Sequence, residues 1–261
     1  MKFGGPARLL AVVLLAAAGA AAQQAPLLTV LPREEQARRW EQRADLRMVQ
    51  KRYLEAIDFY QRALALQPRD PILLNKAGIA HHQLMGIDEA NFKKARKFYE
   101  SATRADPDYP NAWNNLGTLY YDRKDYKKAI NYYQRALKIA PAQAAFHSSL
   151  GMALFARKRY AEAFEEYRVA LLLDPEVFDR HGLFGVTVKG QTVEDRARYE
   201  FLLAKGFASL GYVEKSLAYL RRALEDGFSP AEAQGDPAFA LLRDDPRFQA
   251  LFAELPRPIP R

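Results

Sequence analysis

The chain repeats itself with a period of 34 residues, and this repetition limits its fold more than any other feature of its sequence. One copy is marked by small, aromatic and proline residues at Trp113, Leu116, Gly117, Tyr120, Ala129, Tyr133, Ala136 and Pro141. A shift of 34 residues recovers Leu150, Gly151, Leu154, Ala163, Tyr167, Ala170 and Pro175. Such a period predicts supersecondary units of one kind that stack on their neighbours and share one core.

Three further copies extend the array in both directions. The two upstream copies carry Ala44, Ala56, Tyr60, Ala63 and Pro68, then Gly78, Ala95, Tyr99, Ala102 and Pro107. The second copy is longer by five residues, which are inserted around Gly86 to Asn91. A diverged fifth copy carries Leu203, Ala204, Phe207, Ser216, Leu220 and Ala223, but has Phe228 where proline is expected. The repeats are assigned to residues 37–70, 71–109, 110–143, 144–177 and 197–230.

The spacing within each copy predicts a helical hairpin. Its two helices approach each other most closely where the side chains are smallest, at positions such as Gly117 and Ala136. Large residues such as Trp113 and Tyr133 fill the space beside these crossings. Proline then ends the second helix, because it lacks an amide donor and disfavours a helical residue before it.

This pattern resembles that of the tetratricopeptide repeat family. The resemblance implies an all-α fold, a right-handed solenoid of about five helical hairpins. It also implies that the first helix of each hairpin lines a concave groove, in which family members usually bind peptides.

The segments outside the repeats are predicted from their own composition. Residues 23–36 form an N-terminal segment, and residues 178–196 form an inserted loop that contains three glycines. Thr192 and Asp195 form a capping pair that opens the next helix. Residues 231–261 are assigned to short capping helices and a tail, because Asp236-Pro237 and Asp245-Pro246 each match an N-cap followed by a first-turn proline.

The first 22 residues match a secretory signal peptide. Lys2 and Arg8 precede an apolar run from Leu9 to Ala22 that ends in three alanines. We expect export, to the periplasm or outside the cell, with cleavage near Ala22. The alternative is an uncleaved anchor, although the run of fourteen residues is shorter than the roughly 20 that a spanning helix needs.

No pattern of residues in the sequence indicates catalysis, a cofactor or a metal. Cysteine is absent, and the adjacent His81 and His82 point about 100° apart on a helix, so they do not share a metal ion. The basic residues are interleaved with acidic ones, which favours a solvated surface over a nucleic-acid site. We therefore expect a non-enzymatic protein whose contact with a membrane is only through a partner.

The resemblance implies which residues line the groove, at positions two, five, nine and twelve of each repeat. Those residues are Asn75, Ile79, His82, Asn111, Asn114, Thr118, Tyr121, Ser148, Met152 and Phe155. Asparagine both donates to and accepts from a peptide backbone, so an extended peptide suits this set. The alternative is that these residues pack on the 178–196 loop.

One subgroup of the family clamps a terminal carboxylate with lysines and asparagines at set positions. Here Asn75, Ile79 and Ala145 occupy three of those positions, so this chain departs from that subgroup. The sequence favours a protein-interaction scaffold that helps to assemble envelope or secretion machinery. The alternative is an enzyme or metabolite-binding protein with its site at the groove or the 178–196 loop.

The signal peptide gives a first prediction. We expect the exported protein to begin at Gln23, because the cleavage site requires small residues before the cut. Mass analysis of the mature N-terminus checks this. Material that retains Met1 and fractionates with the membrane would contradict cleavage and support the anchored alternative.

Overall fold

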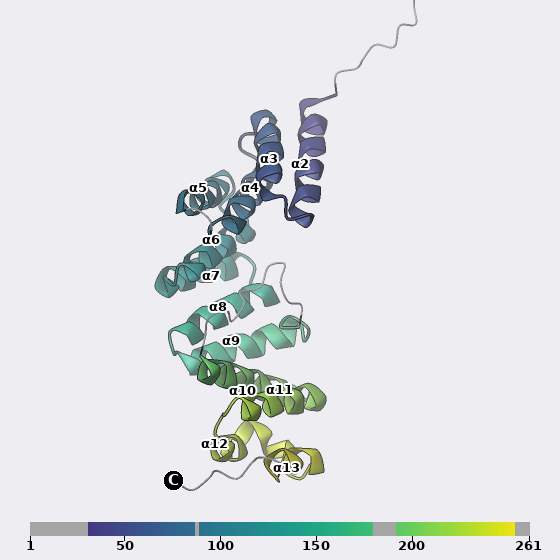
Figure 1. Cartoon of the computed structure of the whole chain (residues 1–261), viewed down its shortest axis with the longest axis vertical. Coiled ribbons are helices and arrows are strands. Elements are labelled where there is room, and N and C mark those ends of the chain that lie inside the picture. Colours follow the sequence, from purple (N-terminus) through teal and green to yellow (C-terminus); the bar gives the residue numbers. More distant parts are fainter. Residues whose placement is uncertain (1–30, 87–88, 180–191, 254–261) are drawn as a thin grey trace, which may run out of the picture.

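The computed structural model describes residues 31–86, 89–179 and 192–253, and its regular elements in these ranges are all helices (Figure 1). Five hairpins follow one another: α2 (Arg33–Val49) and α3 (Tyr53–Leu66), α4 (Pro71–Gln83) and α5 (Glu89–Ala105), α6 (Pro110–Asp122) and α7 (Tyr126–Ile139), α8 (Ala144–Ala156) and α9 (Tyr160–Leu173), α10 (Val193–Ser209) and α11 (Val213–Glu225). Three short helices follow: α12 (Pro230–Gly235), η1 (Pro237–Leu242) and α13 (Pro246–Ala253). The predicted all-α solenoid of about five hairpins with a helical C-terminal cap is confirmed.

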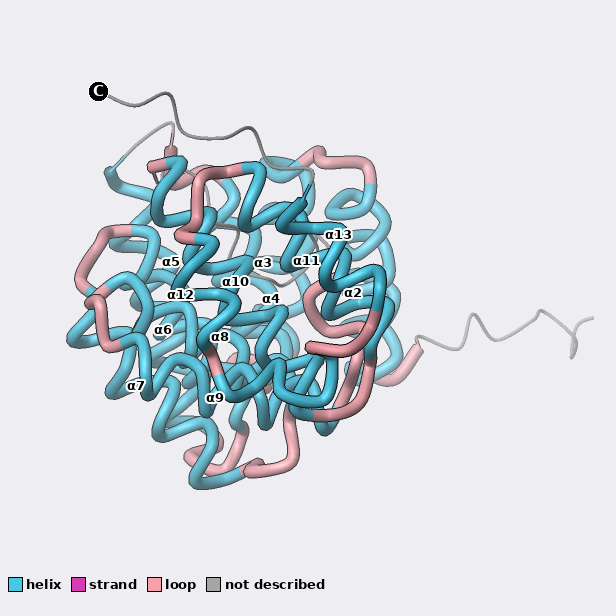
Figure 2. The backbone as a smooth tube through the Cα atoms, turned by 90° about the horizontal axis from the view of Figure 1, so that it is seen from below, coloured by secondary structure: helices cyan, strands magenta, loops and turns pink. Residues whose placement is uncertain are grey.

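The hairpins stack along the long axis of the molecule, from α2 at one end to α13 at the other (Figure 1). The second helix of each hairpin packs against the first helix of the next, and α4, α6 and α8 also contact one another in sequence. The view along this axis shows the helices of successive hairpins overlying one another, with many of the loops around the outside (Figure 2). Each hairpin therefore depends on its neighbours for burial of its apolar faces.

The crossing of the two helices is the tightest packing in the hairpins. A Cβ atom added to Gly117 would lie 2.5 Å from a ring carbon of Tyr133, and Gly78 and Gly151 face Tyr99 and Tyr167 at 2.6 and 2.5 Å. No side chain fits at such distances, so the tyrosine ring lies directly on the glycine backbone. At the corresponding positions the first hairpin has Ala44 and Tyr60 and the fifth has Ala204 and Leu220, all of them buried.

The turn between the two helices has a common geometry in four hairpins. Its residue in left-handed backbone conformation is Lys51, Lys124, Lys158 or Gly211, with φ between 58° and 79°. The same position, the fifteenth of the repeat, is occupied each time. A left-handed residue ends the first helix sharply and reverses the chain, and glycine is the residue that adopts this conformation without steric cost.

In the second hairpin, a buried histidine contacts the residues inserted between the two helices. His81 is stacked on Phe98, and its Nδ1 lies 2.9 Å from the amide oxygen of Asn91, at the far side of the inserted residues. Burial lowers the pKa of His81, so the ring is held neutral beside this amide. His81 is thus a core residue that ties the insertion to α4.

The fifth hairpin begins directly after the predicted Thr192 cap, four residues before the assigned repeat boundary at 197. Helix α10 begins at Val193, within the segment assigned to the 178–196 loop; residues 180–191 lie outside the described residues. The predicted capping pair is confirmed, because the Thr192 hydroxyl accepts a hydrogen bond from the amide of Asp195 at 3.1 Å. Tyr199, the third residue of the assigned fifth repeat, lies over the fourth hairpin, where its ring packs edge-on with those of Phe155 and Tyr167.

The C-terminal helices cover the end of the fifth hairpin. Phe228, which replaces the expected proline, stacks on Phe201 with ring centroids 3.9 Å apart, and Phe201 also meets Phe239 of η1. The two predicted Asp-Pro caps are confirmed: Asp236 accepts from the amide of Ala238, and Asp245 from that of Arg247. Phenylalanine is suited to this position because the chain continues into the cap, whereas proline would contribute no such ring contact.

The crossing gives a second prediction. We expect Gly117→Ala to lower the free energy of unfolding by about 1 to 3 kcal/mol, because the added methyl group overpacks against Tyr133. Gly235→Ala is the matched control, since an added Cβ there meets nothing within 4 Å. Chemical denaturation measures both.

The same experiment includes a rescue. The double variant Gly117→Ala/Tyr133→Leu copies the Ala204 and Leu220 pair of the fifth hairpin, so we expect it to lose less stability than the sum of the two single variants. Strict additivity, or a Gly117→Ala variant as stable as the Gly235→Ala control, would contradict the packing described for this crossing.

Candidate functional site

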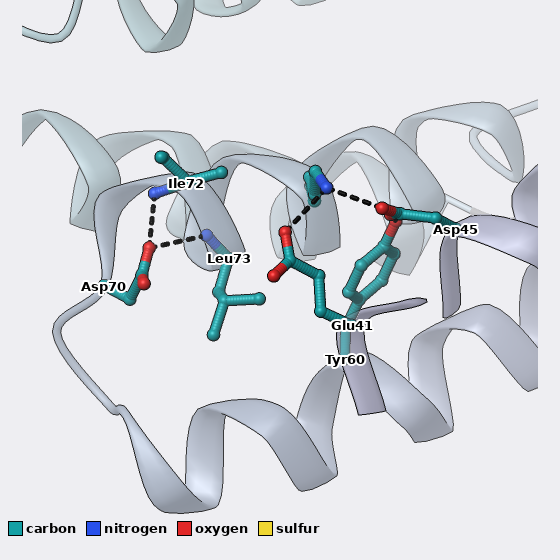
Figure 3. A network of polar contacts seen from close by, with 7 residues as sticks. Glu41, Asp45, Tyr60, Asp70, Ile72 and Leu73 are labelled. Carbon is teal, nitrogen blue, oxygen red and sulfur yellow. Dashed lines mark hydrogen bonds and ion pairs between the residues drawn. The ribbon is translucent and has the colours of Figure 1, made fainter. Parts of the chain in front are cut away.

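The first helices of the N-terminal hairpins share a line of polar side chains. Lys76 of α4 reaches back to α2, where its Nζ lies 2.7 Å from an oxygen of Glu41 and 2.7 Å from an oxygen of Asp45. The Tyr60 hydroxyl donates to the other oxygen of Asp45 at 2.6 Å. Figure 3 shows Glu41, Asp45 and Tyr60 gathered beside α4, whose N-terminus is capped by Asp70.

This cluster carries one more negative than positive charge. Partial burial alone would lower the pKa of Lys76, but its hydrogen bonds to Asp45 and Glu41 outweigh that effect and raise the pKa. Burial also raises the pKa of Tyr60, and the neighbouring Asp45 raises it further, so the phenol stays protonated and donates. The two carboxylates, each partly exposed, are held in place by one cation and one hydroxyl.

The next hairpin repeats the arrangement with uncharged groups. The Asn115 side-chain amide of α6 donates to the Asn75 side-chain oxygen of α4 at 2.9 Å. Counted from the first residue of each repeat, a residue at position five is again joined to the residue at position six of the following repeat, as Glu41 is to Lys76. We call these six side chains the polar ladder: Glu41, Asp45, Asn75, Lys76, Asn114 and Asn115.

Asn114 breaks the series. It stands at position five of the third repeat, only 7% exposed, and its side-chain oxygen has no hydrogen-bond donor among the described residues. Position six of the fourth repeat is Ser149, whose hydroxyl donates instead to the carbonyl of Ala145, at 2.9 Å. A buried oxygen without a donor costs free energy, so Asn114 is the member of this series whose hydrogen bonding is incomplete.

His82 and Thr118 continue the line beyond the polar ladder. His82 lies between Asp122, 2.9 Å from its Nε2, and the Tyr99 hydroxyl, 3.4 Å from its Nδ1. The Thr118 hydroxyl donates to the carbonyl of Asn114 and accepts from the hydroxyl of Tyr133. The contact between His82 and Asp122 joins α4 to α6. Asp122 stays exposed and adds a carboxylate to this edge.

Three of the residues predicted to line the groove are instead core residues. Met152 and Phe155 are each 2% exposed and Tyr121 is 9% exposed. Met152 accepts a hydrogen bond from the Tyr167 hydroxyl, and the Phe155 ring is enclosed by Tyr160 and by Tyr199. Phe155 is covered from two sides, by Tyr160 of α9 and by Tyr199 of α10, and Tyr121 packs against Tyr126 of α7. Asn75 and Asn114 are also buried, at 4% and 7%, but they differ from Met152 and Phe155 in having polar side chains that face other first helices or lack a partner.

The remaining predicted residues are distributed along α4, α6 and α8. Asn111 is exposed, Ser148 is half-buried, and the half-buried Ile79 packs against the core beside Tyr99. Four residues of the polar ladder escaped the sequence analysis. Glu41 and Asp45 stand at positions five and nine of the first repeat, which are groove-lining positions in the family, so the same assignment would have found them. Lys76 and Asn115 stand at position six, which is not a groove-lining position.

The burial of Phe155 gives a third prediction. We expect Phe155→Ala to lower the free energy of unfolding by about 3 to 5 kcal/mol, because it leaves a cavity between α8 and α10. Asn111→Ala, on the exposed surface of α6, should change it by less than about 0.5 kcal/mol. Thermal unfolding followed by circular dichroism distinguishes the two variants. A Phe155→Ala variant as stable as the wild-type protein would contradict the burial of Phe155.

Comparisons with known proteins agree with the repeats. The family models described as Tetratricopeptide repeat match residues 37–70, 110–142 and 144–177. A curated relative, the Heat-shock protein cognate (HSC) co-chaperone sgt12 of Aspergillus fumigatus, is 36% identical over 75 residues. That match covers 29% of this chain and spans only a fifth, 20%, of the relative. No helix in the described part of the chain has the length and apolar character to cross a membrane.

Solved structures share the architecture at low sequence identity. The pilF structure of Pseudomonas aeruginosa matches with a TM-score of 0.54 and 16% identity, covering 85% of this chain and 91% of that one. MamA of Desulfovibrio magneticus RS-1 matches with a TM-score of 0.49 and 18% identity, covering 72% and 93%. The repeats that the family models match, and the helical hairpins that these repeats form, identify the chain as a tetratricopeptide repeat protein.

Proposed function

We propose that this protein is a non-enzymatic scaffold that binds an extended polypeptide along the polar ladder of α2, α4 and α6. The observation that carries the proposal is the buried side-chain oxygen of Asn114, which lacks a donor in a series where the equivalent groups are paired. A peptide backbone would supply an N–H group for Asn114, once rotation of this side chain brings its buried oxygen to the surface, and a carbonyl for the amide donors beside it. A polypeptide lying across these helices would therefore complete their hydrogen bonding.

The charge of this face selects the kind of peptide. Glu41, Asp45 and Asp122 are carboxylates of this face, and the first two are held in position by contacts with Lys76 and Tyr60. A free terminal carboxylate would be repelled here, and the carboxylate-clamping residues of the family are absent at Asn75, Ile79 and Ala145. Peptides with lysine or arginine side chains fit this face, because their charges complement the carboxylates.

The wider role proposed for the scaffold lies outside the cytoplasm, in the assembly of envelope or secretion machinery. Its support is the signal-like sequence from Lys2 to Ala22, which lies outside the described residues. The curated relative is named a co-chaperone, which agrees with a protein whose work is to hold other polypeptides. Membrane contact would then come through the bound partner.

A fourth prediction tests the ladder itself. We expect Asn114→Ala to weaken binding of peptides selected from a random displayed library by about tenfold, while the melting temperature stays the same or rises. Binding weakens because the backbone N–H of the peptide loses its acceptor, and stability does not fall because no internal hydrogen bond of that oxygen is broken. Asn131→Ala is the matched control, an exposed asparagine of α7. Fluorescence anisotropy measures the affinity.

The selected peptides provide the second half of this test. They should be enriched in lysine and arginine, and amidation of their C-termini should not weaken binding. Equal affinity of the Asn114→Ala and Asn131→Ala variants would contradict binding at the ladder, and a requirement for a free carboxylate would contradict the proposed charge selection.

A further inference from the structure

The second helices α5 and α7 carry an excess of positive charge that has no counterpart on the polar ladder. Helix α7 contains four cationic residues and no acidic residue, and α5 contains five cationic residues against two acidic ones. Five exposed lysines of these helices form no ion pair within the described part of the chain. They constitute what we call the basic face: Lys93, Lys94, Lys97, Lys127 and Lys138.

The basic face follows the register of the repeats. Lys93 and Lys127 occupy the same position of successive repeats, the eighteenth once the insertion is discounted. At this position the first, fourth and fifth repeats have Leu54, Ala161 and Glu214. At position 29, Arg104 and Lys138 correspond in the same way, whereas the other repeats have Ala65, Leu172 and Glu225. The cations are therefore concentrated on two adjacent hairpins.

Aromatic packing holds the two helices as one surface. The Phe92 ring of α5 meets the edge of Tyr120, which in turn stacks on Tyr132 of α7 with ring centroids 5.5 Å apart. Lys127 and Lys138 lie eleven residues apart, about 16 Å along α7. That length matches about five residues of an extended chain, so the face is long enough for a short segment of polypeptide.

We infer that the basic face of α5 and α7 is a second interaction surface, which binds an acidic segment of a partner polypeptide. Charge complementarity is the basis, because unpaired lysines attract carboxylates and steer their approach. A lipid surface fits less well, since membrane-bound helices also insert apolar side chains. The large hydrophobic residues exposed in the described ranges lie on other segments, such as Leu46, Leu172 and Leu241, and none lies on α5 or α7.

This inference goes beyond the proposed function and does not depend on it. The polar ladder lies on first helices and favours basic peptides, whereas the basic face lies on second helices and favours acidic ones. The two surfaces therefore select partners of opposite charge. A scaffold with both would hold two different polypeptides at once.

The test uses fluorescein-labelled deca-glutamate as the probe, measured by fluorescence anisotropy with the full chain. We expect Lys127→Glu/Lys138→Glu to weaken probe binding by at least about tenfold. The matched control is Arg69→Glu/Arg157→Glu, which changes the net charge equally at exposed residues outside α5 and α7 and should alter binding less than about twofold. Higher salt should weaken binding of the wild-type protein.

Three outcomes would overturn the inference. The first is absence of deca-glutamate binding, and the second is an equal loss in both charge-reversal variants, which would indicate a response to net charge alone. The third is tighter binding to phosphatidylglycerol vesicles or to a single-stranded DNA oligonucleotide than to deca-glutamate. The neutral variant Lys127→Gln/Lys138→Gln replaces the charge-reversed one if circular dichroism shows that the latter does not fold.

Discussion

The three central hairpins depend on the contact between a tyrosine ring and the bare backbone of a glycine where their two helices cross. Gly117 with Tyr133 is the central example, and a single methyl group on the glycine would occupy the position of the ring. Because this contact fixes the distance and angle between the helices, each hairpin presents the same faces to its neighbours. Stacking then follows from burial of those faces, and no separate long-range interaction is needed to align the array.

Regular stacking also explains why the polar ladder exists. In successive first helices, position five of one repeat comes within hydrogen-bond distance of position six of the next repeat. Glu41 therefore contacts Lys76, and Asn75 contacts Asn115 in the same way. Where the repeat diverges, the pairing fails. Ser149 is too short to continue the series and bonds its own helix, which leaves the oxygen of Asn114 without a donor.

Features set within one repeat were predictable from the sequence. The small residues of the crossings and the Thr192 cap depend on local spacing, and both are present as expected. The exposure of Phe155 was wrongly predicted, because Tyr199 of the next hairpin covers its ring, and spacing within one repeat does not show such a contact between repeats. The hydrogen bond between the Nδ1 of His147 and a carboxylate oxygen of Glu166, 2.6 Å apart, was also missed, since it joins residues of different helices. The fold is therefore predictable from periodicity, whereas the site depends on contacts between repeats.

The central claim is that α6 presents an open polar face to a polypeptide. Site-specific photocrosslinking tests it most directly, with a photoreactive amino acid placed at Asn111 of α6 and, in a separate variant, at Lys127 of α7; both residues are exposed. With a library-selected peptide rich in lysine and arginine, the crosslink should form from position 111 and not from position 127. Crosslinking from position 127 alone would contradict the account, because it would move the bound peptide from the polar ladder to the opposite helix of the hairpin.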